Sequence, residues 1–202
     1  VDSTDSNDAE NAARDYATER SVPYVSPYNH PLIIAGQGTI GKEVMEDGGH
    51  VDTVVVAVGG GGLISGIATW VKAHSPATRI IAASALNDRA MAASIEAGEI
   101  ITPHFEPTFS DGTAGGLEDD SMTFDICREL VDEWVDVTEA DIATAVTNMI
   151  DDHHQLVEGS AGVAIAAAIA HAAQAPGSRI VAVSCGANVS SDALARMIAA
   201  AG

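Results

Sequence analysis

The stretch VVVAVGGGGLISG, residues Val54–Gly66, decides the fold of this 202-residue chain. A β-branched apolar run stops at four glycines, and an amphipathic segment that suits a helix follows them through Trp70 and Lys72. The pattern predicts a strand, a glycine loop and a helix. Glycine has no Cβ, so an anion can approach the loop amides closely, and the helix N-terminus adds partial positive charge. The stretch therefore predicts a phosphate site.

The spacing of the glycines separates this loop from two familiar phosphate loops. A dinucleotide-binding G-x-G-x-x-G pattern needs glycine at position 64 or 65, where Ile64 and Ser65 stand, and no lysine follows the glycines as a P-loop requires. A tight strand-to-helix turn without a ligand is the structural alternative. A binder of phosphorylated sugars or nucleotides that uses the glycine loop alone is the weaker functional alternative.

The rest of the chain alternates strand and helix signals. Apolar runs predict strands over 79–85, 134–137 and 179–184, and helices over 8–20, 91–97, 122–132 and 159–174. A further helix is expected after the capping pattern at Thr138, and another begins in the glycine-containing stretch 33–40. Continuous apolar strands are typical of a parallel sheet covered on both faces. We therefore predict an α/β fold, a three-layer αβα arrangement around a mostly parallel sheet, with ligands at the carboxyl ends of the strands.

Composition excludes several classes of partner. The net charge of −20 argues against nucleic acid and anionic membranes. The acidic residues are scattered, which favours a solvated surface suited to a high-salt cytosol over a binding site for cationic partners. No segment reads as a membrane span or signal peptide, so we expect a cytoplasmic protein. The cysteines, Cys127 and Cys185, predict no disulfide framework.

Five ordered segments resemble the pyridoxal-phosphate enzymes of the tryptophan synthase β fold, and among these the threonine and serine ammonia-lyases and the serine racemases. The segments are AGQGT at 35–39, GGGGL at 59–63, SDG with GG within 110–116, EGSAG at 158–162 and CGAN at 185–188. The resemblance implies pyridoxal 5'-phosphate as cofactor. It also implies β-elimination of L-threonine to 2-oxobutanoate and ammonia, or of L-serine to pyruvate. A serine racemase-like enzyme is the alternative.

The same resemblance assigns roles to individual residues. It places the cofactor's phosphate on Gly59, Gly60, Gly61, Gly62 and Leu63. It places Cys185 opposite the pyridine nitrogen and Glu158 near the ring. A neutral partner such as a thiol leaves that nitrogen largely unprotonated, which favours elimination over transamination. The structural alternatives are a buried thiol for Cys185 and a helix-start carboxylate for Glu158.

One family feature is absent. The relatives hold the cofactor as a Schiff base on a lysine in an S-x-K-x-R-G-A-type motif, whereas the lysines here, Lys42 and Lys72, match no such motif. We therefore assign no catalytic residue and expect a fold truncated at the N-terminus and inactive alone. Residues 1–28 are expected to be a remnant of the small domain and residues 29–202 the C-terminal part of the large cofactor-binding domain.

A non-catalytic or split-enzyme subunit is the alternative from a different class, since a partner bearing the lysine would complete the site. The resemblance implies either a homo-oligomer or pairing with such a lysine-bearing half. No metal is predicted. Ser84 stands where several relatives carry a glutamate that helps bind a divalent cation, and His153 and His154 are adjacent residues that would point apart on a helix.

Overall fold

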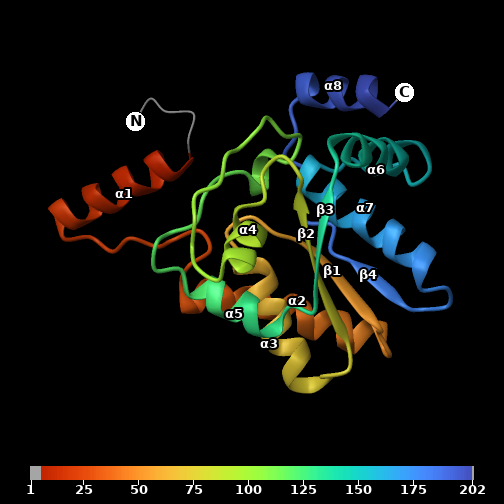
Figure 1. Cartoon of the computed structure of the whole chain (residues 1–202), viewed down its shortest axis with the longest axis horizontal. Coiled ribbons are helices and arrows are strands. Elements are labelled where there is room, and N and C mark those ends of the chain that lie inside the picture. The colour runs from red at the N-terminus through yellow and green to blue at the C-terminus, as the bar shows by residue number, and fades with distance from the viewer. Residues whose placement is uncertain (1–5, 202) are drawn as a thin grey trace.

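The computed structural model describes residues 6–201, with side chains from Ala9 onward. Its helices are α1 (Ser6–Arg20), α2 (Pro31–Gly48), α3 (Gly62–His74), α4 (Ala90–Ala97), the short 3₁₀ helix η1 (Asp111–Thr113), α5 (Met122–Leu130), α6 (Glu139–Asp151), α7 (Gly159–Gln174) and α8 (Ser191–Ala201). Its strands are β1 (Thr53–Ala57), β2 (Arg79–Ala85), β3 (Glu133–Val137) and β4 (Ile180–Ala182). Figure 1 shows α1 standing apart from a layered body that holds the other elements.

The four described strands form one sheet in the order β3-β2-β1-β4. Every pairing between these strands is parallel, and Val55 of β1 lies opposite Ile81 of β2 and Ala182 of β4. The prediction of a parallel sheet is confirmed. Parallel strands all end at the same edge, so the loops that follow β1 and β4 meet there.

Alternate residues of β1 face opposite helical layers. Val54 and Val56 belong to a buried cluster with Ile67 of α3, whereas Val55 belongs to a second cluster with Val163 of α7. Each of these side chains is fully buried. This division of one apolar run between two faces confirms the three-layer αβα arrangement, which is visible in Figure 1.

The helix α2 starts earlier than the glycine-containing stretch 33–40 predicts. It begins at Pro31, whose fixed φ suits the first helical position, and His30 Nδ1 accepts a hydrogen bond from the Leu32 amide at 3.2 Å. At Thr138 the predicted cap is confirmed, because its Oγ1 accepts from the Asp141 amide at 3.2 Å.

Two elements near the C-terminus depart from their predicted form. The nearly all-apolar segment 159–174 predicts a buried helix, and α7 has these bounds, but burial stops after Ala168 and Ile169 is 55% exposed. The strand β4 spans 180–182 instead of 179–184, because among the described strands it pairs with β1 alone. The strand β4 lies at one edge of the described sheet, whereas α7 packs across its face through Val163 and Ala167.

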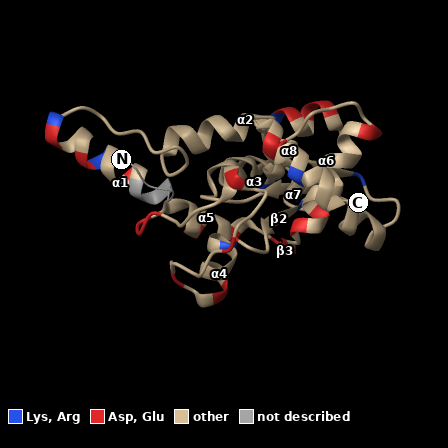
Figure 2. Ribbon diagram, turned by 90° about the horizontal axis from the view of Figure 1, so that it is seen from above, with Lys and Arg blue, Asp and Glu red and all other residues tan. Residues whose placement is uncertain are grey.

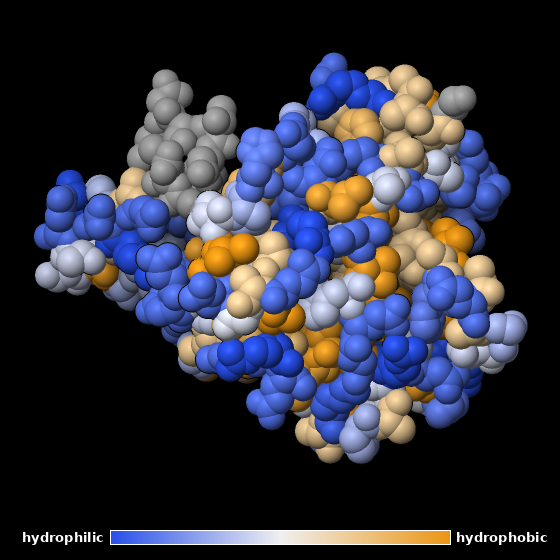
Figure 3. Space-filling model, in the orientation of Figure 1, coloured by the Kyte–Doolittle hydropathy of each residue, from blue (hydrophilic) through white to orange (hydrophobic). Residues whose placement is uncertain are grey.

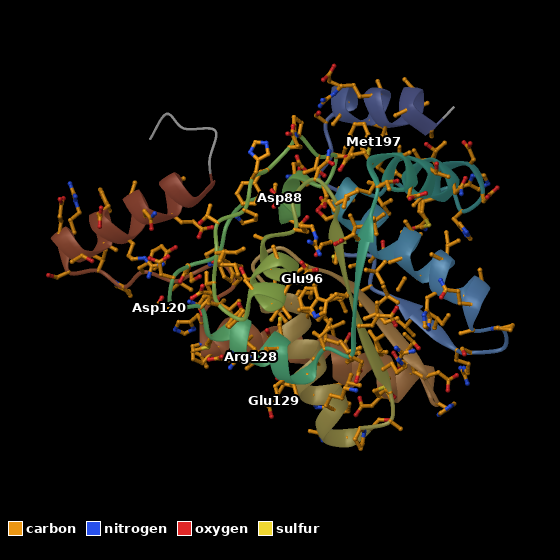
Figure 4. All side chains as sticks on the ribbon, in the orientation of Figure 1. Asp88, Glu96, Asp120, Arg128, Glu129 and Met197 are labelled. Carbon is orange, nitrogen blue, oxygen red and sulfur yellow. The ribbon has the colours of Figure 1, made fainter. Side chains whose placement is uncertain are left out.

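The helix α8 closes the body on the α6 side. Its Met197, labelled in Figure 4, points from α8 toward α6 and is fully buried in a cluster with Val146 and Ala161. This contact ties the C-terminal helix to the layer that contains α7.

The surface carries its acidic residues on many elements. Figure 2 shows Asp and Glu spread over helices and loops around the molecule, and Figure 3 shows hydrophilic residues covering most of one face with apolar residues between them. The suitability of this surface for high salt stays a prediction. Across residues 6–201, no helix has both the length and the apolar character needed to cross a membrane.

The buried thiol of Cys127 makes the stability of the fold depend on pH. Burial raises the pKa of Cys127 to about 12, whereas the pKa of a cysteine thiol in an unfolded chain is about 8.5. The fold therefore favours the neutral thiol, and this contribution is complete below about pH 8.5 and is lost as the pH rises toward 12.

We expect the free energy of unfolding to fall by about 1.4 kcal/mol for each pH unit above 8.5 from this group. Urea unfolding of the reduced protein at several alkaline pH values measures the slope, and Cys127→Ala is the control that should flatten it. Equal slopes for the two proteins would show that Cys127 is not the cause.

Candidate functional site

A hollow of about 370 Å³ lies at the carboxyl edge of the sheet, and we call it the glycine-loop hollow. All seven residues predicted for the cofactor line it, namely Gly59, Gly60, Gly61, Gly62, Leu63, Glu158 and Cys185. Residues that the sequence did not single out for the site line it as well, among them Tyr28, Gln37, Thr113 and Ser160. The structure thus brings six separate segments of the chain to one place.

The start of α3 supplies hydrogen-bond donors to the glycine-loop hollow. Gly61 is the N-cap, with a left-handed φ of 80° that glycine adopts without strain. The Ser65 amide makes the first helical bond, to the Gly61 carbonyl at 3.0 Å. The amides of Gly62, Leu63 and Ile64 come before this first donor and therefore have no acceptor within α3. These N–H groups and the helix dipole suit a phosphate.

Packing of Tyr28 is a second reason for glycine in the loop, and the sequence did not reveal it. A Cβ on Gly60 would lie 2.5 Å from Tyr28 Cγ, and one on Gly62 would lie 2.8 Å from Tyr28 Cβ. The tyrosine thus packs directly on the loop, in space that side chains would otherwise fill. Thr123 holds the loop from another direction by donating from Oγ1 to the Gly60 carbonyl at 2.7 Å.

The position of Tyr28 depends on Glu118. Tyr28 Oη accepts a hydrogen bond from the Glu118 amide at 2.7 Å. The Glu118 carboxylate accepts from Ser26 Oγ and Asn29 Nδ2, each at 2.7 Å, and pairs with Arg14 of α1 at 3.0 Å. Burial raises the pKa of Tyr28, so its phenol stays neutral. These contacts connect α1 to the wall of the glycine-loop hollow.

Glu158 opens α7 on another wall. Its Oε2 accepts from the Asn188 amide at 2.9 Å, and its own amide donates to the Gly186 carbonyl at 3.1 Å. Glu158 is the N-cap residue, but its side chain makes no capping bond within the helix. The carboxylate therefore ties the start of α7 to the loop that carries Cys185.

Cys185 is half-buried and lines the glycine-loop hollow. Burial, and then the nearby charge of Glu158, raises the pKa of Cys185. The side chain is therefore a neutral thiol near neutral pH. Such a group can share a hydrogen bond with a ring nitrogen without placing a negative charge beside it.

The loop over 100–116 adds a third side to the glycine-loop hollow. Gly112 and Thr113 of η1 line it, and Ser110 Oγ lies 2.6 Å from Thr113 Oγ1. The loop is anchored by Asp88, which lies between β2 and α4 and is labelled in Figure 4, because its Oδ2 accepts from the Gly115 amide at 2.9 Å. Gly112, from the SDG segment that resembles the family, thus forms part of the site wall, and Gly115 of the GG segment helps to hold the loop in place.

Both lysines lie outside the lining of the glycine-loop hollow. Lys42 is half-exposed on α2 and lies 3.6 Å from Glu46. Lys72 donates from Nζ to Asp132 at 2.6 Å and to the Thr78 carbonyl at 2.9 Å. Neither ammonium group is placed to react with a molecule bound on the glycine loop.

The residues considered for a metal are also separated. Ser84 is buried in β2, opposite Asp136 of β3. His153 and His154 are exposed and lie just beyond α6, so they are not helical neighbours as the sequence suggested. Within residues 6–201, no three His, Cys, Asp or Glu side chains form a group that could hold a metal ion. The expectation that the chain binds no metal stays a prediction.

Comparison with known proteins gives the same family for nearly the whole chain. Residues 1–186 match the family model described as pyridoxal-phosphate dependent enzyme. The chain is 42% identical over 144 residues to the catabolic L-threonine dehydratase TdcB of Escherichia coli, covering 71% of this chain and 44% of that protein. It is 37% identical over 175 residues to the L-threonine ammonia-lyase of Thermotoga maritima, covering 87% and 43%.

Solved structures agree with the sequence relatives. The processed form of threonine deaminase isoform 2 from Solanum lycopersicum superposes with a TM-score of 0.89 at 33% identity, over 95% of this chain and 56% of that one. Maize serine racemase superposes with a TM-score of 0.82 at 32% identity, over 94% and 60%. The tryptophan synthase β-like fold expected from the resemblance is thereby confirmed. The chain spans about half the length of the curated relatives it matches.

Proposed function

The chain belongs to the pyridoxal-phosphate dependent enzyme family, and on this premise we propose that it is the cofactor-holding part of a threonine or serine ammonia-lyase. The observation that carries the proposal is the meeting of the α3 amides and the neutral Cys185 thiol in the glycine-loop hollow. The dehydratase relatives support threonine as the substrate, with 2-oxobutanoate and ammonia as products.

The donors and acceptors of the glycine-loop hollow fit pyridoxal phosphate. The amides of Gly62, Leu63 and Ile64 would donate to its phosphate at the positive end of α3. The thiol of Cys185 would meet the pyridine nitrogen. When bound, this cofactor supplies a ring that withdraws electrons from the amino-acid substrate. A neutral thiol would moderate that withdrawal of electrons and so favour loss of a β-hydroxyl over transamination. Tyr28, which packs on the glycine loop, would shield the loop from water.

We also propose that this chain binds the cofactor without linking to it covalently. Lys42 and Lys72 lie away from the glycine-loop hollow, and neither matches the motif of the cofactor-linking lysine. On this proposal the chain alone has no lyase activity. Residues 1–28 would belong to the small domain, and residues 29–202 to the large one.

Pairing with a polypeptide that carries the lysine is supported by an apolar groove. It has a volume of about 580 Å³ and lies between α2, α3 and α5, where Ile34, Trp70 and Met122 line it. A cytoplasmic homo-oligomer is the alternative assembly. Light scattering of the purified protein separates the two, because a homo-oligomer needs no second polypeptide.

Spectroscopic titration of the purified chain with pyridoxal phosphate tests the proposal. We expect saturable binding of one cofactor per chain. After borohydride reduction of this complex, we expect the intact mass of the polypeptide to be unchanged. The Lys42→Arg/Lys72→Arg variant should bind equally well. Absence of saturable binding would overturn the cofactor assignment, whereas 2-oxobutanoate formed from threonine by the chain alone would overturn its inactivity.

A serine racemase-like enzyme is the second candidate, supported by the superposition on maize serine racemase. The neutral Cys185 suits either chemistry. Chiral analysis distinguishes them in the assembled enzyme, once a lysine-bearing partner is supplied. Formation of D-serine from L-serine in excess of pyruvate would favour racemisation and count against the lyase.

A further inference from the structure

Ser160 carries a buried hydroxyl without a hydrogen-bond partner. The residue is 3% exposed in the first turn of α7, and its Oγ takes part in none of the hydrogen bonds made by the described residues. A buried hydroxyl in this state costs free energy, because it has given up its bonds to water without replacement. A native protein keeps such a group where something else satisfies it.

The surroundings of Ser160 indicate what that partner is. Ser160 lines the glycine-loop hollow together with Glu158 and Gly112. A Cβ on Gly112 would lie 2.6 Å from Ser160 Oγ and 3.0 Å from Glu158 Oε1, so the hydroxyl and the carboxylate approach the same point of η1. The glycine leaves these two polar groups space at the wall of the hollow.

Ser160 and the phosphate-binding amides approach the hollow from different sides. The helix α3 packs with Val54 and Val56 on one face of the sheet, and α7 packs with Val55 on the other. A ligand whose phosphate lies on the N-terminus of α3 would therefore present its remaining part to α7 and Ser160. In pyridoxal phosphate that part is the pyridine ring with its polar substituents.

We propose that the Ser160 hydroxyl hydrogen-bonds the pyridine-ring portion of the cofactor and is a ligand-binding residue of this site. The inference rests on the proposed function, since it takes the α3 amides as the phosphate site. It adds a contact from α7 to the one expected from Cys185. The contact is formed only in the complex, so Ser160 lowers the stability of the free protein and raises its affinity for the cofactor.

The chain offers a matched control in Ser84. Its hydroxyl is also buried without a hydrogen-bond partner among the described residues, and the residue is 1% exposed. Ser84 lies in β2 and is not among the residues that line the glycine-loop hollow. Alanine at either position removes an unsatisfied hydroxyl, but only Ser160→Ala removes one from the site.

The experiment compares the wild type, Ser160→Ala and Ser84→Ala in three measurements. These are the Tm without ligand, the Kd for pyridoxal phosphate and the Kd for inorganic phosphate. We expect both variants to raise the Tm by about 2–4 °C. Ser160→Ala should weaken pyridoxal phosphate binding by about 5- to 10-fold and leave inorganic phosphate binding unchanged. Ser84→Ala should change neither affinity.

The opposite directions of the two effects exclude a merely structural role, which would lower Tm and affinity together. Unchanged pyridoxal phosphate affinity in Ser160→Ala would overturn the inference and leave the proposed function standing. Equal weakening for pyridoxal phosphate and inorganic phosphate would also overturn it, because the effect would then not belong to the ring. A wild-type chain that binds no pyridoxal phosphate would overturn the proposed function and the inference with it.

Discussion

Replacing Gly66 with alanine is expected to lower the free energy of unfolding by about 3 kcal/mol, the largest effect on stability that we predict for one methyl group. Gly66 lies where α3 crosses α2, and an added Cβ would overlap the Ile34 carbonyl oxygen. Gly38 of α2 faces the same crossing, where a Cβ would lie 3.2 Å from the Gly66 oxygen. The obstacles are backbone atoms of two packed helices, so the added methyl can be accommodated only by separating them.

Urea unfolding monitored by circular dichroism measures this loss. The matched control is Gly36→Ala in α2, where a Cβ would meet nothing within 4 Å. It should stabilise the protein by about 0.5–1 kcal/mol, because alanine is the better helix former. Similar free energies for Gly66→Ala and the wild type would show that the α2–α3 crossing is looser than the structure describes.

The second large effect is expected for cofactor binding. Gly60→Ala should weaken pyridoxal phosphate binding by about 100-fold or more, since the new Cβ would lie 2.5 Å from the Tyr28 ring and would displace the loop. The amides that bond a charged phosphate contribute about 1.5–3 kcal/mol each, so misplacing two of them accounts for the loss. Fluorescence or absorbance titration with pyridoxal phosphate measures it.

A compensating change separates this mechanism from general damage. The three atoms nearest to a Cβ on Gly60 all belong to the Tyr28 ring. Adding Tyr28→Ala to Gly60→Ala removes the clash and should recover part of the affinity, although Tyr28→Ala alone weakens binding. Additive losses in the double variant would mean that Tyr28 does not limit the loop, and the argument for its role would fail.

The parallel sheet could be predicted because its signals are local. The run before the glycines and the run over 79–85 are continuously apolar, which indicates strands buried on both faces. Their bounds agree with those of β1 and β2 within a residue or two. The limits of β4 and the exposed C-terminal end of α7 could not be predicted in this way. Both depend on which strands and helices pack against them, and the composition of a segment does not show which elements those are.

The binding residues also fall into those that local motifs predict and those that depend on contacts between distant segments. Gly59 to Leu63, Glu158 and Cys185 were accessible from motifs because each belongs to a short segment with its own pattern. Tyr28 was missed because its partner is the glycine loop, more than thirty positions away along the chain. Ser160 stood within a quoted motif, yet its role depends on its lack of a hydrogen-bond partner among the described residues, which only the tertiary structure reveals.

The sequence by itself determined the layered αβα fold, the phosphate-binding character of the glycine loop and the mismatch of Lys42 and Lys72 with the cofactor-linking motif. These follow from hydrophobic periodicity, from glycine's missing Cβ and from residue identity, which are properties of neighbouring positions. Only the tertiary structure decided that Tyr28 packs on the loop, that Glu158 joins α7 to the Cys185 loop and that Ser160 lies buried beside them. Those features depend on distances between segments far apart in the chain, which packing of the whole core sets.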